Sequence, residues 1–142
     1  DLVVRRAQAP SELDEFSEVQ ARGFLENEDV YAVWKPILKQ ANDQNLADPN
    51  QFFFVGYRRG QAVGTSLLVS DGVSFGVYAV ATLPSERKKG IASAVMKEGL
   101  GQAGAQISKA PVVLQVARGS YAESLYRKLG FVEEAHAIVY SR

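Results

Sequence analysis

The chain has 142 residues, with 16 lysines and arginines balanced by 16 aspartates and glutamates, and it contains no cysteine. A chain of this length corresponds to one domain, which buries roughly 68–70% of the surface that its unfolded form exposes. The zero formal net charge excludes a global attraction to nucleic acid or to an anionic membrane, so any anion has to be bound by a local site. The lack of cysteine excludes disulfides, thiolate metal sites and a cysteine nucleophile.

Targeting and domain organisation follow from the distribution of apolar residues. No apolar run approaches the roughly 18–20 residues of a membrane span, and the first residues contain no apolar signal region. We therefore expect a cytoplasmic protein without a membrane partner. Because the chain begins at Asp1 and not at a methionine, we expect either a processed product or a domain from a longer protein. No repeat, low-complexity tract or linker interrupts it, so residues 1–142 are predicted to form a single domain.

The first elements are predicted to be a strand and a helix. Residues 2–6, "LVVRR", have the composition of a short strand. The next segment, residues 10–24, is predicted to be helical, with Ser11 as its N-cap and Asp14 three residues later. Its apolar residues recur at helical spacing and define the inward face: Leu13, Phe16, Val19 and Phe24.

A second helical pattern, in residues 28–43, contains a proline. Apolar residues recur at the spacing of a helix at Val30, Val33, Trp34, Ile37, Leu38 and Ala41. Pro36 lies within this pattern, and a proline inside a helix removes a hydrogen bond and clashes with the preceding turn. We expect the helix either to begin near Pro36 or to kink there. In the first case residues 29–35 form a loop or a separate turn.

The middle of the chain changes to a strand-like period. Residues 51–57, 61–70 and 73–83 are rich in β-branched and aromatic residues. The segment "RRG" joins the first two and "DG" joins the next two, and short glycine-containing connections are typical of hairpins. These three segments are therefore predicted to form an antiparallel meander.

A third helix is predicted after a basic turn. Its expected inward face consists of Ala92, Val95, Met96, Gly99 and Ala103. Glycine in a helix interior costs about 1 kcal/mol relative to alanine. Because glycines also occupy positions 99, 101 and 104, we expect the second half of this helix to be loosely held or to end early.

The last elements are predicted to be a strand, a helix and one or two closing strands. Residues 111–117, "PVVLQVA", form a continuous apolar run suited to a buried strand. Residues 120–130 are predicted to be helical and to stop at Gly130, and residues 131–142 to form the closing strands. The inward face of the helix is expected to contain Ala122, Leu125, Tyr126 and Leu129.

The stretch "ERKKGIA", residues 86–92, lies between the third strand of the meander and the helix that follows. A basic, glycine-containing turn at a helix start offers free backbone N–H groups and the positive end of the helix dipole, which suits a phosphate or pyrophosphate. The alternative is a solvated loop. The order strand, turn, helix, strand favours the anion site, because it places this turn at the carboxyl end of a strand.

At these residues the sequence resembles the GCN5-related N-acetyltransferases. The family's signature turn is Arg or Gln, two residues, Gly, one residue, then Gly or Ala, and here it is Arg87-Lys88-Lys89-Gly90-Ile91-Ala92. The flanking "VATLP" (residues 80–84) and "AESLYRKLGF" (residues 122–131) are similar to further family landmarks. The resemblance implies an α+β, three-layer α/β/α acyl-CoA N-acyltransferase fold with a mixed, mostly antiparallel sheet. It also implies transfer of an acetyl group from acetyl-CoA to an amine.

The resemblance assigns the cofactor residues mostly through their backbone. Consecutive N–H groups of residues 88–93 are expected to bind the pyrophosphate, where Gly90 lets the backbone approach closely. The backbone of residues 80–82 is expected to pair with the pantetheine arm, and a bulge or splay at that strand end to aim an N–H at the thioester carbonyl as an oxyanion donor. The full set of expected cofactor residues is Val80, Ala81, Thr82, Arg87, Lys88, Lys89, Gly90, Ile91, Ala92 and Ser93.

Tyr126 is the expected catalytic side chain, because the family places a tyrosine after the leucine of "LY" to protonate the departing thiolate. A phenol of pKa near 10 is a reasonable donor to a thiolate of pKa about 8.5. The alternative is a core tyrosine whose hydroxyl binds a carbonyl. Two positions depart from the family pattern: Gly119 replaces an asparagine, and Gln115 stands near the position of a glutamate base in some members.

The base and the acceptor site are less determined. Glu26, Glu28 and Asp29 are either bases or loop charges, and no role is assigned to His136. Tyr31, Trp34 and Tyr78 are expected to line the acceptor pocket, the alternative being core packing, which we favour for Trp34. The expected acceptor is a small-molecule or peptide amine, with no metal and no nucleic acid, and the family permits a homodimer. The alternative function is a catalytically inactive acyl-CoA sensor. A nucleotide-binding class is disfavoured because the chain has no Walker or dinucleotide motif.

Overall fold

The structure is a computed structural model, and it describes residues 1–25, 27–103, 111–116 and 118–133. The elements follow one another in the predicted order up to the last helix. They are β1 (Leu2–Arg6), α1 (Pro10–Phe24), α2 (Glu28–Asn45), β2 (Gln51–Arg58), β3 (Gln61–Ser70), β4 (Phe75–Thr82), a short 3-10 turn (Pro84–Glu86), α3 (Ile91–Gln102), β5 (Val112–Leu114) and α5 (Tyr121–Lys128). Of the predicted closing strands, residues 131–133 have no regular structure and residues 134–142 lie outside the described part.

The strands form one mixed sheet in the order β1-β2-β3-β4-β5 within the described residues. All neighbours are antiparallel except β4 and β5, which are parallel. Arg59 and Gly60 have φ of 52° and 77°, so the β2–β3 hairpin has the positive-φ pair of a type I′ turn. The predicted antiparallel meander and the mostly antiparallel sheet are therefore confirmed.

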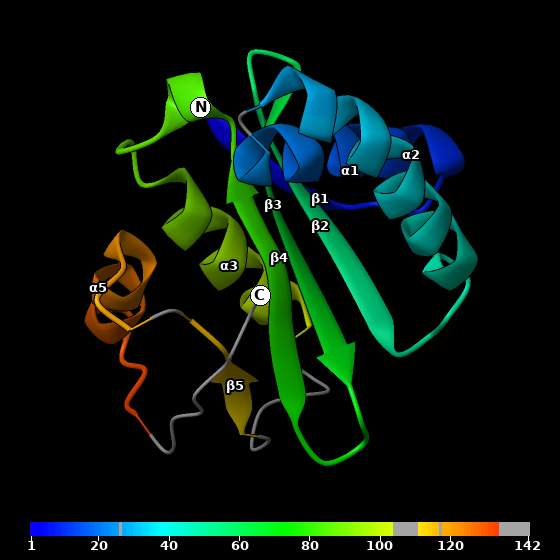
Figure 1. Cartoon of the computed structure of the whole chain (residues 1–142). Coiled ribbons are helices and arrows are strands. Elements are labelled where there is room, and N and C mark those ends of the chain that lie inside the picture. Colours follow the sequence, from blue (N-terminus) through cyan, green and yellow to red (C-terminus); the bar gives the residue numbers. More distant parts are fainter. Residues whose placement is uncertain (26, 104–110, 117, 134–142) are drawn as a thin grey trace, which may run out of the picture.

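Helices cover both faces of the sheet (Figure 1), with α1 and α2 on one side and α3 and α5 on the other. Neighbouring residues of a strand point to opposite faces, so Phe53 packs with Phe16 of α1, whereas Phe54 packs with Val95 and Met96 of α3. Two hydrophobic cores thus flank one sheet, and the three-layer α/β/α architecture is confirmed.

Helix α1 begins differently from the prediction. Its N-cap is Ala9 and not Ser11, and Pro10 occupies the first helical position, where its missing N–H costs nothing. The carboxylate of Glu12 accepts hydrogen bonds from the backbone N–H of Gln8 (3.0 Å) and Ala9 (3.1 Å), so an acidic side chain of the first turn replaces the hydroxyl cap. Phe24, predicted to point inward, is exposed at the end of the helix.

Helix α2 corrects one expectation about the segment around Pro36. The helix is continuous from Glu28 to Asn45, so the loop predicted for residues 29–35 is wrong. The side chain of Asn27 caps its start by accepting from Asp29 N–H (2.8 Å) and Val30 N–H (3.2 Å), which offsets part of the cost of the proline. The apolar stripe of this helix is exposed, at Val30, Val33, Trp34 and Ile37.

The elements after the basic turn also differ in detail. Helix α3 runs through Gly99 and Gly101 to Gln102, so the early end is wrong. Gly99 is buried against Phe54, where an added Cβ would lie 2.9 Å from a ring carbon, which is why a glycine serves there. The buried strand predicted for residues 111–117 is shorter, at Val112–Leu114, and Val113 is exposed.

No helix among the described residues is long and apolar enough to cross a membrane.

Candidate functional site

A bulge interrupts strand β4 near its carboxyl end. Thr65 of β3 pairs with Ala81 and Leu67 pairs with Tyr78, so two residues of β4, Ala79 and Val80, face the single residue between them on β3. Ala79 has φ of 51°, a left-handed conformation that a residue with a side chain adopts only at a cost. The bulge that the family resemblance implies is therefore present in this strand.

Strand β5 stops pairing with β4 just before this bulge. The parallel ladder joins residues 75–77 of β4 to residues 112–114 of β5 and extends no further in the described part of the chain. Leu83 N–H donates to Val63 C=O (3.0 Å), on the β3 side. Because backbone groups alternate in direction along the regular part of a strand, Thr82 directs its N–H and C=O to the other side, which β5 has left. An extended chain could pair with β4 there.

The basic turn follows β4 and leads into α3 (Figure 1). Lys88 and Gly90 have φ of 63° and 76°, and left-handed residues in a turn bring successive N–H groups together in an anion-binding concavity. The first helical hydrogen bond runs from Ala94 N–H to Gly90 C=O (3.0 Å), so the N–H groups of residues 91–93 precede it and point out of the helix start. Gly90 has nothing within 4 Å of an added Cβ, so its positive φ is what favours glycine.

The three basic side chains of the turn differ in their surroundings. Lys89 Nζ forms an ion pair with Glu86 (2.9 Å), and Glu86 also binds Arg58 (2.9 Å). Arg87 donates to Gly23 C=O (2.7 Å) and so ties the turn to the end of α1. Lys88 is exposed and has no partner among the described residues, so its charge is the most available of the three.

Tyr126 of α5 belongs to the same hydrophobic core as Val77 and Ile91, and Val80 borders that core. Its side chain is mostly buried, and its ring contacts Phe131 edge-on at 6.0 Å between centroids. Burial raises the pKa of the Tyr126 phenol above its ordinary value, which keeps it protonated. Its hydroxyl forms no hydrogen bond with any described residue, so the carbonyl-binding alternative gains no support from this part of the chain.

The two departures from the family pattern have different consequences. Gly119 has φ of 80°, and its N–H donates to Glu123 Oε1 (2.8 Å), so this position holds the start of α5 together. Gln115 follows the end of β5 and is exposed. Among the possible bases, Glu28 forms an ion pair with Arg22 (2.8 Å), whereas Glu26 and His136 lie outside the described residues. In that described part, no three His, Asp or Glu side chains are grouped to hold a metal ion.

The expected acceptor residues lie on two elements. Tyr31 is held against α1, because its hydroxyl donates to Glu18 (2.8 Å to Oε2) and the Arg22 guanidinium lies 3.6 Å from its ring centroid. Trp34 is 47% exposed, so the core packing that we favoured for it is wrong. Tyr78 of β4 is 54% exposed, and its ring covers Gly76.

A large hollow lies elsewhere on the described surface. It has a volume of about 810 Å³ and separates α1 from the β2–β3 turn and the residues after β4. Its acidic residues are already paired: Asp14 with Lys39, Glu15 with Tyr57, and Glu18 with Lys35. None of the expected site residues lines this hollow.

Comparison with known proteins identifies the family. A family model described as an acetyltransferase (GNAT) domain matches residues 49–133, which is more than half of the chain. The chain belongs to the GNAT acetyltransferases. No curated protein sequence matches this GNAT chain significantly.

Solved structures share the whole GNAT fold. AAC(6')-Iy, in complex with the bisubstrate analogue CoA-S-monomethyl-acetylneamine, is 14% identical over 100% of this chain and 98% of its own, with a TM-score of 0.75. The aminoglycoside antibiotic 6'-N-acetyltransferase AAC(6')-IG from Acinetobacter haemolyticus is 17% identical over 99% and 97%, with a TM-score of 0.74. A GCN5-related N-acetyltransferase from Ralstonia eutropha is 17% identical over 99% of each chain, with a TM-score of 0.76.

Two residues of this GNAT domain make contacts near the candidate site that the sequence did not predict. Glu18 of α1 binds Tyr31 and Lys35 of α2, and Thr65 of β3 binds the carbonyl of Ala79 in the bulge. A glutamate on a polar helix face and a threonine within a strand are both ordinary. No signal in the sequence distinguishes them, because both contacts depend on how the elements pack.

Proposed function

We propose that this GNAT domain transfers the acetyl group of acetyl-CoA to an amine of a small molecule or peptide, within a ternary complex. The observation that carries the proposal is the convergence of three features at one end of β4. The bulge at Ala79–Val80, the end of β5 pairing after Val77 and the exposed N–H groups at the start of α3 follow one another along the chain.

Each part of acetyl-CoA has a matching group in this proposal. The pyrophosphate accepts hydrogen bonds from the backbone of residues 88–93, with Arg87, Lys88 and Lys89 supplying positive charge. The pantetheine arm pairs with the backbone of Val80–Thr82, on the side of β4 that β5 has left. Together these contacts direct the thioester toward the bulge.

The proposed reaction is a direct displacement at the thioester carbon. The amine nitrogen forms a bond to the carbonyl carbon, and the negative charge on the oxygen is stabilised by a backbone N–H of the bulge. The C–S bond then breaks, and the thiolate takes the phenolic proton of Tyr126, which burial keeps in place at neutral pH. The proton lost by the amine passes to water.

We propose that the acceptor binds on the α2 side of β4, beside Tyr31, Trp34 and Tyr78. Trp34 and Tyr78 are both half-exposed aromatic rings, which stack on apolar or cationic ligands. Of the solved structures, AAC(6')-Iy is bound to a bisubstrate analogue that joins CoA to acetylneamine, and AAC(6')-IG is named an aminoglycoside 6'-N-acetyltransferase. Both support a small-molecule amine as the acceptor. The proposal includes a cytoplasmic location, as expected from the sequence.

The test is calorimetric titration of the protein with acetyl-CoA, with ADP and ATP as controls. We expect saturable binding of acetyl-CoA and much weaker binding of either nucleotide, followed by CoA release with members of an amine panel that includes aminoglycosides. Lys88→Ala should weaken acetyl-CoA binding about two- to five-fold, and Lys89→Ala less, because Lys89 is already paired with Glu86.

Three results would count against the proposal. Absence of acetyl-CoA binding at millimolar concentration would remove it. Tight binding without CoA release from any amine would favour the acyl-CoA sensor. Equal competition by ATP would point to a nucleotide-binding protein.

A further inference from the structure

Thr65 lies under the β4 bulge and is completely buried. It sits on β3, pairing with Val55 on one side and Ala81 on the other. Its hydroxyl Oγ1 donates a hydrogen bond of 2.8 Å to the carbonyl oxygen of Ala79. The partner is therefore the left-handed residue of the bulge, bound by a side chain from the neighbouring strand.

This contact fixes the orientation of one peptide group. The C=O of Ala79 and the N–H of Val80 belong to the same peptide unit, and no peptide bond of the described chain is cis. In a trans peptide the two groups point in opposite directions. Because Thr65 holds the carbonyl toward itself, the Val80 N–H points away from the Thr65 hydroxyl, at a residue of β4 that is no longer paired with β5.

The left-handed conformation of Ala79 needs such support. Alanine at φ of 51° is less stable than in an extended strand, so without an added contact this peptide would tend to rotate back. Glycine would occupy the conformation at no steric cost, yet the chain has alanine there. Within the described structure, the hydrogen bond from Thr65 to this peptide group supplies that support.

We propose that Thr65 is a positioning residue for the acetyl transfer, acting by holding the Val80 N–H in the direction of the thioester oxygen. This inference rests on the proposed function, since it assumes that acetyl-CoA lies along the open side of β4. Thr65 itself touches no reacting atom. Its hydroxyl orients the group that stabilises the oxyanion.

The experiment compares Thr65→Val with Thr65→Ser in the full chain. Valine keeps the shape of threonine without the hydroxyl, whereas serine keeps the hydroxyl. We expect Thr65→Val to lower kcat about ten-fold, part of the 10²–10³-fold effect of removing an oxyanion donor, with the Kd for acetyl-CoA unchanged. Thr65→Ser should retain kcat close to that of the wild-type protein.

The matched control is Ser17→Ala. Ser17 is another completely buried hydroxyl that donates to a backbone carbonyl, Leu13 C=O at 2.9 Å, but it lies in α1. Ser17→Ala should lower the thermal stability and leave kcat unchanged. If Thr65→Val does not fold, the double variant Thr65→Val/Ala79→Gly replaces it, because glycine removes the cost of the left-handed conformation while the hydroxyl is still missing.

A second measurement is the NMR shift of the Val80 amide proton on addition of acetyl-CoA. We expect a downfield shift in the wild-type protein and in Thr65→Ser, and its loss in Thr65→Val. If Thr65→Val keeps the wild-type kcat and the wild-type amide shift, the inference is wrong and the proposed function stands. The same holds if Thr65→Ser is as slow as Thr65→Val. If the wild-type protein binds acetyl-CoA without turnover, the amide shift alone tests the role of Thr65. If the wild-type protein does not bind acetyl-CoA, both the proposed function and the inference fail.

Discussion

Tyr126 shows how one side chain acquires two properties from its place in the fold. Helix α5 starts at the Ser120 cap, whose side chain accepts from Glu123 N–H (3.2 Å), and this start turns Tyr126 toward the core shared with α3. Burial there raises the pKa of the phenol, and the hydroxyl has no hydrogen-bond partner in the described part of the chain. A hydroxyl that keeps its proton is what a proton donor to a thiolate requires.

At the residue scale we predict that Tyr126→Phe lowers kcat about 10²-fold while leaving the Kd for acetyl-CoA within about two-fold. The ring, which carries the packing, is unchanged, and only the proton donor is lost. The measurement is CoA release at saturating acetyl-CoA, together with calorimetry.

Tyr57→Phe is the control for this prediction. Tyr57 is buried on the other face of the sheet, donates to Glu15 Oε1 (2.9 Å), and has a pKa raised to about 12 by burial and by Glu15. Its removal should lower the melting temperature without affecting turnover. A Tyr126→Phe variant with normal kcat would exclude the proton-donor role.

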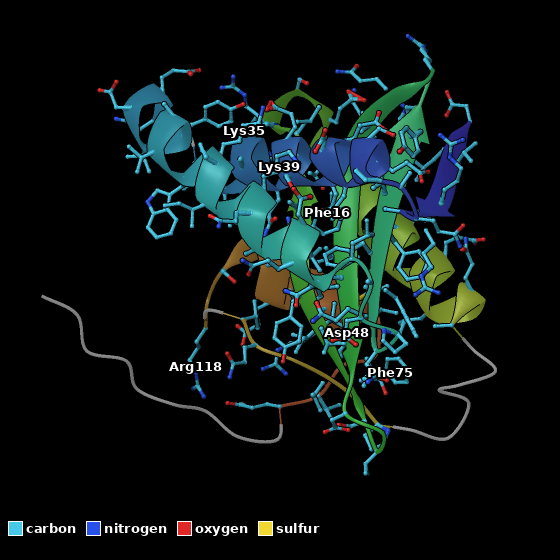
Figure 2. The ribbon with its side chains drawn as sticks, turned by 90° about the vertical axis from the view of Figure 1, so that its right-hand side faces the viewer. Phe16, Lys35, Lys39, Asp48, Phe75 and Arg118 are labelled. Atoms are coloured by element: carbon cyan, nitrogen blue, oxygen red, sulfur yellow. The ribbon has the colours of Figure 1, made fainter. Side chains whose placement is uncertain are left out.

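Helix α2 is held to the rest of the molecule largely by polar contacts with α1. Figure 2 shows Lys35 and Lys39 between the two helices, where Lys35 binds Glu18 (2.9 Å) and Lys39 binds Asp14. Asn42, the buried residue of this helix, donates to Ser17 (2.9 Å) and Gln20 (2.9 Å). The apolar stripe faces solvent instead, so the attachment of α2 depends on charge more than on buried area.

At the element scale we predict that acid loosens α2 before it unfolds the sheet. Burial alone would raise the pKa of Glu18, but hydrogen bonds from Tyr31 and Lys35 and the charges of Lys35 and Arg22 outweigh it and lower the pKa below 4.5. A carboxyl with a lowered pKa contributes stability above its ordinary pKa, and this is lost as the pH falls through the lowered value. Protonation of Glu18 should therefore release α2 below pH 4.5.

The chain contains a single tryptophan, Trp34, which lies in α2, so its fluorescence reports on this helix. We expect the fluorescence to change at a higher pH than the far-ultraviolet circular dichroism. In Glu18→Gln the fluorescence step should be absent or much reduced, at a cost of no more than about 1 kcal/mol near pH 7, because Glu18 is partly exposed. Coincident transitions in the wild-type protein would refute the separate loosening of α2.

The molecule as a whole consists of two cores on opposite faces of one sheet, and the start of α3 and Tyr126 belong to one of them. Phe53 packs with Phe16 of α1, in an edge-on contact of 5.1 Å between ring centroids. Phe54 packs under α3 against Gly99, in the core that also contains Tyr126. Ile91 at the start of α3 and Tyr126 belong to this second core, and Val80 of the bulge packs against it, whereas Ala79 packs against the first core.

At the scale of the molecule we predict that Phe53→Leu and Phe54→Leu have similar effects on stability and different effects on cofactor binding. Both rings are 1% exposed, so each substitution should cost about 1–2 kcal/mol. Only Phe54→Leu should weaken acetyl-CoA binding, because the Phe54 ring packs against α3 and determines its position on the sheet. Thermal unfolding, and calorimetry well below the melting temperature, provide the two measurements. Equal weakening of binding by both substitutions would contradict this assignment of the start of α3 to one core.

The local sequence by itself determined the order of the elements up to the last helix, the hairpin at Arg59–Gly60, the basic turn at residues 87–92 and the helix around Tyr126. Each of these rests on interactions among residues close in the chain: alternation of side chains, positive φ at glycine, and hydrogen bonds at helix ends. Residues of the cofactor turn could be named because their role depends on backbone conformation that neighbouring residues impose.

Only the tertiary structure decided which contacts join distant parts of the chain. It continued α2 through Pro36, because the Asn27 cap and side chains of α1 offset the lost hydrogen bond, and it left Trp34 exposed because α2 packs on α1 and not on the sheet. It placed Thr65 beneath the Ala79 carbonyl and ended β5 pairing before Val80. Such contacts depend on the relative position of whole elements, which the periodicity of a single segment does not encode.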